Sequence, residues 1–342
     1  MPHKATFVAK IGKITQTSTC YLRDNCALCY QQTIYNRQTN IMDSDRSTLK
    51  AHLAILLCNI VWACDYPFYN LVLGRYIEPV AMVTGSLIVA AALSFIPTLW
   101  QPSERIQRSD WPVIIVAALM IGMARKLLLM YGLSRTSPID GSIISTVSPL
   151  IVLPLSALCG VDRITTRKAI GLVIGLLGAV AVIVSGSTSS HHNSDIAGNA
   201  MLFCGTCVTA LYIVFFKHLV ARYRITTLLR LIYTISAIAM LPFGAQSLFD
   251  ISFKTMDTRI VLAALFVLIV PTYLPNLLLN YSLRYVAPTL TSIYAYIQPL
   301  LAITLSVAMG LDHLHLDTVL FGSVVFLGVG LVISAYKERP RT

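Results

Sequence analysis

Two adjacent cations, Arg125 and Lys126, lie inside an apolar run of the sequence, GMARKLLLMYGL (residues 122–133). An ionisable side chain at the centre of a membrane-spanning helix costs about 2.5–3.5 kcal/mol on insertion scales, so such residues are candidates for a functional site. Neighbouring helical residues point about 100° apart. We therefore expect Arg125 to face a central cavity, and Lys126 to reach for the outer membrane interface or a neighbouring helix.

A carboxylate in an earlier apolar segment offers the counter-charge. Asp65 and Arg125 lie about equally far from the predicted starts of their segments, so they are expected at similar depth. Asp65 shares a helical face with Trp62 and Tyr69, at spacings i−3 and i+4. Two hypotheses remain open. Asp65 and Arg125 either pair in the lining of a cavity, where a substrate or a proton can exchange one partner, or form a fixed structural ion pair.

Two later apolar segments carry hydrogen-bonding side chains in place of charges. Spacings of three or four residues place each set on one helix face: Tyr273, Asn276 and Asn280, and Thr291, Tyr294 and Gln298. An amide that faces lipid lacks hydrogen-bond partners, so both faces are expected to turn inward. They either line the substrate cavity or hold helices together.

Long apolar helices must position all of these residues. Of the 342 residues, 56% are hydrophobic and only 12% are charged, whereas a soluble domain carries about 25% charged residues. The composition predicts an all-α polytopic membrane protein. Segments of about 20 apolar residues predict ten transmembrane helices: 49–73, 79–100, 111–133, 138–160, 168–186, 196–217, 226–249, 259–283, 287–310 and 316–336.

The polar stretch before these segments differs in character. Residues 1–48 are mildly basic and have no apolar core, so they do not resemble a secretory signal peptide. We expect a disordered extension, or a stretch that lies upstream of a natural start at Met42. The hydrophobic remainder divides into residues 49–186 and 196–337, five predicted helices each.

The basic residues predict the orientation of the chain in the cytoplasmic membrane. The formal net charge is +11, but the basic residues lie between apolar segments, so they bear on orientation and not on nucleic-acid binding. With the N-terminus in the cytoplasm, most loop Lys and Arg fall on the cytoplasmic side. Both termini are therefore predicted to be cytoplasmic.

Metal and redox chemistry find little support in the sequence. Cys26 and Cys29 have metal-ligand spacing without a second such pair, while Cys204 and Cys207 lie in an apolar segment. Four predicted loop histidines are expected to be solvated: His191, His192, His313 and His315. No metal and no cofactor are predicted.

An internal repeat is the most informative feature. The stretch LLLMYGLSRTSPIDGSIISTVSPLIVLPLSALCGVDR (127–163) aligns without gaps to LLLNYSLRYVAPTLTSIYAYIQPLLAITLSVAMGLDH (277–313) at an offset of 150. The offset matches Pro138 with Pro288 and Pro149 with Pro299. Five predicted spans separate the copies, and this odd number gives the halves opposite orientations. Inverted repeats are typical of secondary transporters, with the binding site between the halves.

These stretches resemble the EamA repeat of the drug/metabolite transporter superfamily. The segment IVWACDYPF is similar to the entry of that family's first helix, and the resemblance covers residues 49–337. It implies ten helices in two inverted five-helix repeats. The sequence departs from the family pattern at Ala63, Asp162 and Asp312, and it lacks the arginine often found in the second span.

These features predict a secondary transporter that exports a small organic metabolite or drug-like compound by alternating access. An intramembrane lipid-modifying enzyme is the alternative, although the chain has no HExxH motif and no P-loop. The expected partners are the small-molecule substrate and the lipid bilayer, without nucleic acid. Substrate identity, direction, proton coupling and oligomeric state stay open.

Overall fold

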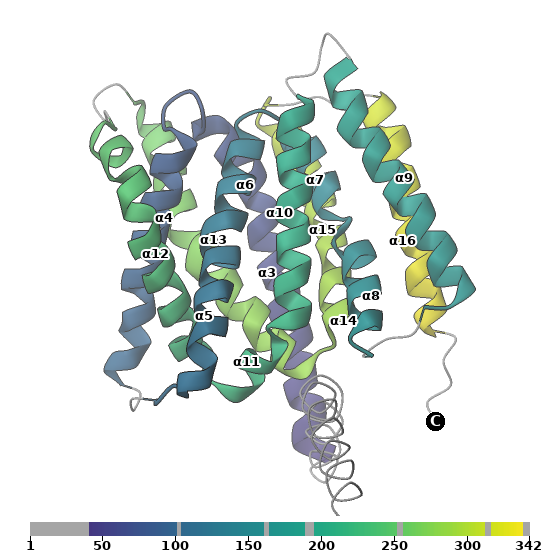
Figure 1. Ribbon diagram of the computed structural model, residues 1–342. Helices are drawn as coiled ribbons and strands as arrows, with labels where there is room; N and C mark the ends of the chain where they lie inside the picture. The colour runs from purple at the N-terminus through teal and green to yellow at the C-terminus, as the bar shows by residue number, and fades with distance from the viewer. Residues whose placement is uncertain are drawn as a thin grey trace, which may run out of the picture.

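The computed structural model describes residues 41–100, 104–160, 164–188, 195–251, 256–311 and 316–337 of the chain. Within these ranges the protein is a bundle of helices packed side by side (Figure 1), and the only pairing between extended residues is one isolated bridge, Leu73 to Ile77. The described chain begins at Ile41 and ends at Lys337 at the same end of the bundle, the lower end in Figure 1.

Two groups of helices follow one another along the chain. The first comprises α3 (Ile41–Val72), α4 (Pro79–Phe95), α5 (Trp111–Ala117), α6 (Arg125–Leu133), α7 (Pro138–Ser145), α8 (Ser148–Leu158) and α9 (Thr166–Thr188). The second comprises α10 (Ile196–Phe215), α11 (Lys217–Arg222), α12 (Ile225–Phe249), α13 (Thr258–Tyr285), α14 (Pro288–Ile293), α15 (Ile297–Ala308) and α16 (Leu316–Lys337). Short 3-10 turns and one π-helix complete them: η2 (Ile96–Leu99), η3 (Arg108–Asp110), η4 (Ala118–Ala124, the π-helix) and η6 (Tyr294–Tyr296).

Eight helical segments of the described chain are long and apolar enough to cross a membrane. The other two predicted spans coincide with shorter apolar helices, Pro79–Phe95 and Val319–Val332. The protein is therefore an all-α integral membrane protein, as the composition predicts. The N-terminal boundary differs from the expected one, because α3 begins at Ile41 and residues 41–48 are helical.

Two of the predicted spans are interrupted helices. Residues 138–160 form α7 and α8, separated by a turn at Thr146 and Val147. Residues 287–310 form α14 and α15, separated by the 3-10 turn η6. Pro149 and Pro299 stand in the first turns of α8 and α15, and because a proline has no N–H group, the hydrogen bond that would continue the preceding helix is missing.

A π-helix interrupts the third predicted span just before Arg125. The carbonyl of Ala118 accepts a hydrogen bond from the Ser236 hydroxyl of α12 at 2.8 Å. Gly122 makes room for this contact, because a Cβ there would lie 2.0 Å from the Ser236 hydroxyl oxygen. The wider turn therefore occurs where another helix inserts a polar side chain.

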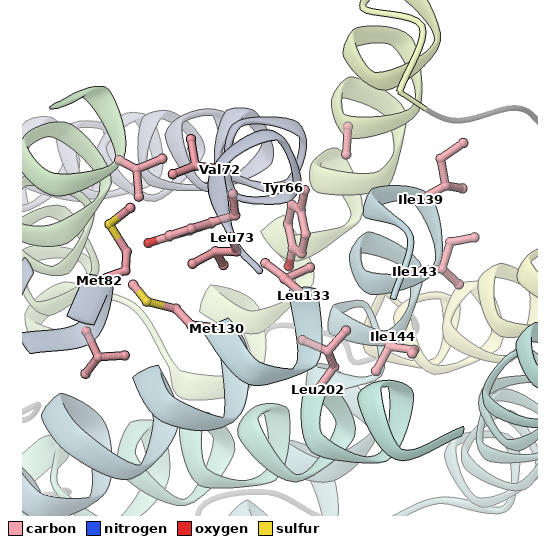
Figure 2. Close-up of a cluster of buried hydrophobic side chains, with 14 of the residues drawn as sticks. Tyr66, Val72, Leu73, Met82, Met130, Leu133, Ile139, Ile143, Ile144 and Leu202 are labelled. Atoms are coloured by element: carbon pink, nitrogen blue, oxygen red, sulfur yellow. The ribbon is translucent and has the colours of Figure 1, made fainter. Parts of the chain in front are cut away.

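Buried apolar side chains fix the helices around the central part of the bundle. Figure 2 shows side chains of α3, α4, α6, α7 and α10 meeting in one cluster, with Met82 and Met130 between α4 and α6. Helices of the two groups also interleave, since α13 packs along α3 and α10 packs along α6 and α8. This packing positions the polar side chains described next.

Helices α9 and α16 form a closely packed pair at one edge of the bundle (Figure 1), and their inner residues join the main buried cluster. A Cβ at Gly328 of α16 would lie 2.3 Å from the main-chain nitrogen of Gly175 and 2.6 Å from the carbonyl oxygen of Gly171, both on α9. Small residues allow such close approach of membrane helices. The glycines of the two helices therefore hold this pair together.

Candidate functional site

A cavity of about 80 Å³ lies between α3, α6 and α7 from the first group and α10, α13, α14 and α15 from the second. This volume has room for several water molecules. Six of the ten residues predicted for a substrate cavity line it: Trp62, Asp65, Tyr69, Arg125, Thr291 and Gln298. Their role in substrate binding stays a prediction.

Arg125 presents its guanidinium to this cavity from the start of α6. Its Nε donates to the Thr209 hydroxyl of α10 at 2.9 Å, and its Cζ lies 5.0 Å from the ring centroid of Trp62. A cation over the face of an indole is stabilised electrostatically. The terminal nitrogens have no hydrogen-bond partner among the described residues. Because these nitrogens form a planar fork, they can bind a carboxylate through two parallel hydrogen bonds.

Asp65 lines the same cavity but does not pair with Arg125. The residue is 5% exposed, and its Oδ1 has no hydrogen-bond partner among the described residues. Within the described ranges, no cationic nitrogen lies within 4.0 Å of its carboxylate. The expected direct ion pair is therefore wrong, because Thr209 and Trp62 hold the Arg125 guanidinium instead.

Lys126 points away from the cavity lining and joins two other helices. Its Nζ donates to the Ser86 hydroxyl of α4 at 2.9 Å and to the Thr272 hydroxyl of α13 at 3.1 Å. Both hydroxyls donate their own protons to main-chain carbonyls of their helices. The carbonyl used by Thr272 is free because Pro271 has no N–H group. Lys126 thus reaches neighbouring helices, one of the two expected outcomes.

Gln298 is the centre of a hydrogen-bond network at the cavity wall. Its Oε1 accepts from the Tyr66 hydroxyl at 3.1 Å and from the Ser145 hydroxyl at 3.0 Å, while its Nε2 donates to Asn59 Oδ1 at 2.6 Å. The network ties α15 to α3 and α7. The residues Asn59, Tyr66 and Ser145 are additions to the predicted site, and all three line the cavity.

The other four predicted residues do not line the cavity: Tyr273, Asn276, Asn280 and Tyr294. Asn276 and Asn280 each donate to a main-chain carbonyl one turn earlier in α13, and Asn280 also accepts from Tyr212 at 2.8 Å. Tyr294 pairs with His52 of α3 at 2.8 Å. Asn280 and Tyr294 thus contact neighbouring helices, whereas the hydrogen bond that Asn276 donates stays within α13.

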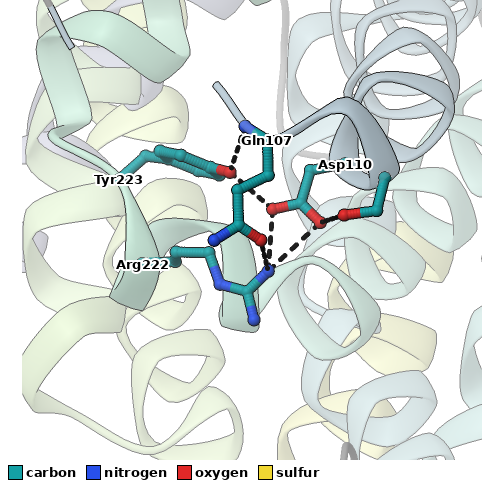
Figure 3. A network of polar contacts seen from close by, with 5 residues as sticks. Gln107, Asp110, Arg222 and Tyr223 are labelled. Atoms are coloured by element: carbon teal, nitrogen blue, oxygen red, sulfur yellow. Dashed lines mark hydrogen bonds and ion pairs between the residues drawn. The ribbon is translucent and has the colours of Figure 1, made fainter. Parts of the chain in front are cut away.

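A second polar network joins the start of the third predicted span to the segment after α10. As Figure 3 shows, Asp110 accepts from the Arg222 guanidinium at 2.8 and 3.1 Å and from the Tyr223 hydroxyl at 2.6 Å. The main-chain N–H of Gln107 donates to the same Tyr223 hydroxyl at 3.2 Å. Burial and the Asp110 carboxylate raise the pKa of Tyr223. This network lies at the lower end of the bundle in Figure 1.

Within the described ranges, no three His, Cys, Asp or Glu side chains come together as candidate metal ligands. The loop histidines and the Cys26–Cys29 pair lie outside the described residues. The described cysteines, which include Cys204 and Cys207, are free thiols.

Comparisons with known proteins agree with this architecture. The model of the EamA-like transporter family matches residues 49–184 and 196–334. An uncharacterized transporter of Archaeoglobus fulgidus is 26% identical over 259 residues, which cover 76% of this chain and 90% of the relative. The uncharacterized transporter YyaM of Bacillus subtilis is 24% identical over 78% of this chain and 88% of its own length.

A solved crystal structure of another protein shares the fold. It matches with a TM-score of 0.59 at 16% sequence identity, over 86% of this chain and 99% of its own. At this identity the likeness concerns the fold alone.

Proposed function

Because the chain belongs to the EamA-like transporter family, we propose that it is a secondary transporter that exports a small organic compound across the cytoplasmic membrane by alternating access. The observation that carries this proposal is the cavity between the two family-matched parts of the chain, where Arg125 and Asp65 present charges that no described side chain pairs. Unpaired charges at membrane depth are costly, and function is the usual reason to keep them.

Ten helices in two inverted five-helix repeats form part of this proposal. The breaks in the helices support it, because α7–α8 is interrupted at residues 146–147 and α14–α15 at residues 294–296, and these breaks overlap at the offset of 150. The Tyr296 hydroxyl donates to the Thr146 carbonyl at 3.2 Å, and these two residues correspond at that offset. A contact between equivalent positions is expected near the axis that relates two repeats, and discontinuous helices commonly form transporter binding sites.

Both termini are proposed to face the cytoplasm. The excess of Lys and Arg in the predicted cytoplasmic loops supports this orientation. The position of Ile41 and Lys337 at one end of the bundle agrees with it. In this orientation the network of Asp110, Arg222 and Tyr223 closes the cytoplasmic end and has to open during each transport cycle.

Removing the carboxylate of this network is expected to open the cytoplasmic end. In Asp110→Ala, Arg222 and Tyr223 lose hydrogen bonds to a charged partner, worth about 1.5–3 kcal/mol each. The assay uses a chain in which Cys58, which is 0% exposed, is the only cysteine. We expect a membrane-impermeant maleimide on the cytoplasmic side to label Cys58 about tenfold faster in Asp110→Ala than without this substitution. Gln246→Ala, which removes an exposed hydrogen bond to Asp250, is the control. Equal rates in both variants contradict the closing role.

Transport itself is tested by comparing metabolites in cells with and without the protein. A transporter changes how an unmodified small compound divides between cells and medium. The enzymatic alternative predicts an altered lipid species instead, with no redistribution of small compounds. Redistribution should also disappear in Arg125→Gln at equal protein abundance. If the redistribution persists in Arg125→Gln, transport does not depend on the Arg125 side chain of this cavity.

A further inference from the structure

Two charged side chains line the proposed cavity and a third lies just behind its wall, and the charges of the three do not sum to zero. Arg125 and Asp65 line it, while Lys126 lies on the far face of the same α6 turn. Each of the three interacts electrostatically with the other two. Lys126 is 5% exposed, and its two described partners are neutral hydroxyls. With all three groups ionised, two positive charges stand against one negative charge.

We propose that the substrate is a small organic monoanion with a carboxylate group; this inference rests on the proposed transport function. A bound monoanion brings the sum of the charges to zero. A zwitterion leaves it at one positive charge, and a cation raises it to two. Because an uncompensated charge is costly at membrane depth, the monoanion is the ligand class that the cluster favours.

The geometry gives each part of such a ligand a place. Arg125 already uses its Nε on Thr209, so its two terminal nitrogens are the groups that a carboxylate engages. Asp65 offers no donor for a carboxylate and instead offsets one of the two cations. Aliphatic side chains supply much of the remaining lining and suit a short hydrocarbon chain: Leu129, Leu133, Leu202 and Leu279.

Trp62 provides a reporter of binding, because the Arg125 guanidinium lies over its ring. The chain has three tryptophans, so Trp100→Phe and Trp111→Phe leave Trp62 as the only one. The experiment uses this full-length chain in nanodiscs of uncharged phospholipid. The probes share one carbon skeleton: 3-methylbutanoate as the anion, valine as the zwitterion and 3-methylbutylamine as the cation. We expect saturable changes of emission with 3-methylbutanoate, and affinities for the other two at least about tenfold weaker.

A cycle of charge variants tests whether the summed charge of the three side chains determines the affinity for the anion. Lys126→Gln lowers the summed charge to zero, and we expect about tenfold weaker binding of 3-methylbutanoate, although Lys126 does not line the cavity. Asp65→Asn raises the sum to two and should strengthen binding by about the same factor. The double variant restores a sum of one, so its affinity should return to that of the parent. A purely structural role of Lys126 predicts no such recovery.

The outcomes separate this inference from the transport proposal. If valine or 3-methylbutylamine binds more tightly than 3-methylbutanoate, the cavity still binds ligands but the substrate is not a monoanion. Unchanged affinity in Lys126→Gln also overturns the monoanion assignment. If that variant does not fold, Asp65→Asn decides alone, because only a charge-governed site gains affinity for the anion. If none of the three probes changes the emission of Trp62, the result counts against the cavity as a binding site, and so against both proposals.

Discussion

Replacing Arg125 with glutamine is expected to abolish transport while the chain still inserts and folds. The guanidinium has no carboxylate within hydrogen-bonding reach among the described residues, so its removal leaves no newly unpaired anion in direct contact. Removing this partly buried cation also relieves part of its desolvation cost. A ligand loses charge-assisted hydrogen bonds worth about 1.5–3 kcal/mol each, which corresponds to a loss of transport of at least about 100-fold. The measurement is substrate uptake into vesicles, normalised to protein amount.

Matched variants sharpen this test. Arg125→Lys keeps the charge but loses the planar fork, so we expect an intermediate loss. Arg259→Gln changes an exposed arginine at the start of α13 and should transport normally. Recovery of transport in the double variant Asp65→Asn/Arg125→Gln would instead support a structural pair of these two charges. Normal transport in Arg125→Gln alone would remove Arg125 from the site.

Replacing Gly328 with valine is expected to separate α9 from α16 and destabilise the protein. The added Cβ meets main-chain atoms of Gly175 and Gly171 at 2.3 and 2.6 Å, and main-chain atoms cannot rotate away. Overpacking costs about 1–3 kcal/mol where side chains can still adjust. We therefore expect the free energy of unfolding to fall by about 3 kcal/mol or more. Thermal unfolding in detergent, followed by size-exclusion chromatography, measures it.

Gly330 supplies the control within the same helix. A Cβ at Gly330 meets no heavy atom within 4 Å, and Gly330→Val makes the same change in helix propensity. We therefore expect Gly330→Val to unfold near the temperature of the parent chain. Equal unfolding temperatures for the two valine variants would show that close packing of α9 on α16 does not limit stability.

The helices could be predicted from the sequence because their cause is local. A run of about 20 apolar residues has to be helical in a bilayer, since its main chain finds no other hydrogen-bond partners. The length of an apolar run does not predict the interruptions of the helices after Ser145 and Ile293. Pro149 and Pro299 are visible in the repeat, but a proline in a membrane helix bends it or breaks it depending on its neighbours. Hydropathy does not distinguish a π-turn from an α-turn.

The candidate site could be predicted in part. The similar depths of Asp65 and Arg125 in their predicted segments indicated that both could lie at one cavity. These depths did not reveal that Thr209 and Trp62 hold the guanidinium. That preference depends on how α10 packs against α6. Helical periodicity on α3 also contained a missed signal, since Asn59 lies three residues before Trp62. On α13, Asn276 and Asn280 are both buried, but spacing alone cannot tell a cavity wall from a contact between helices.

The π-helix at Ala118–Ala124 has a consequence for how the two halves are compared. A π-turn closes with i→i+5 hydrogen bonds and so contains one residue more than an α-turn. The corresponding part of α13 is continuous α-helix. Under the proposed repeat, the correspondence between the halves is therefore displaced by one residue before Ala118. An alignment of the halves needs a single gap there, and equivalence at a constant offset holds only from the π-helix onward.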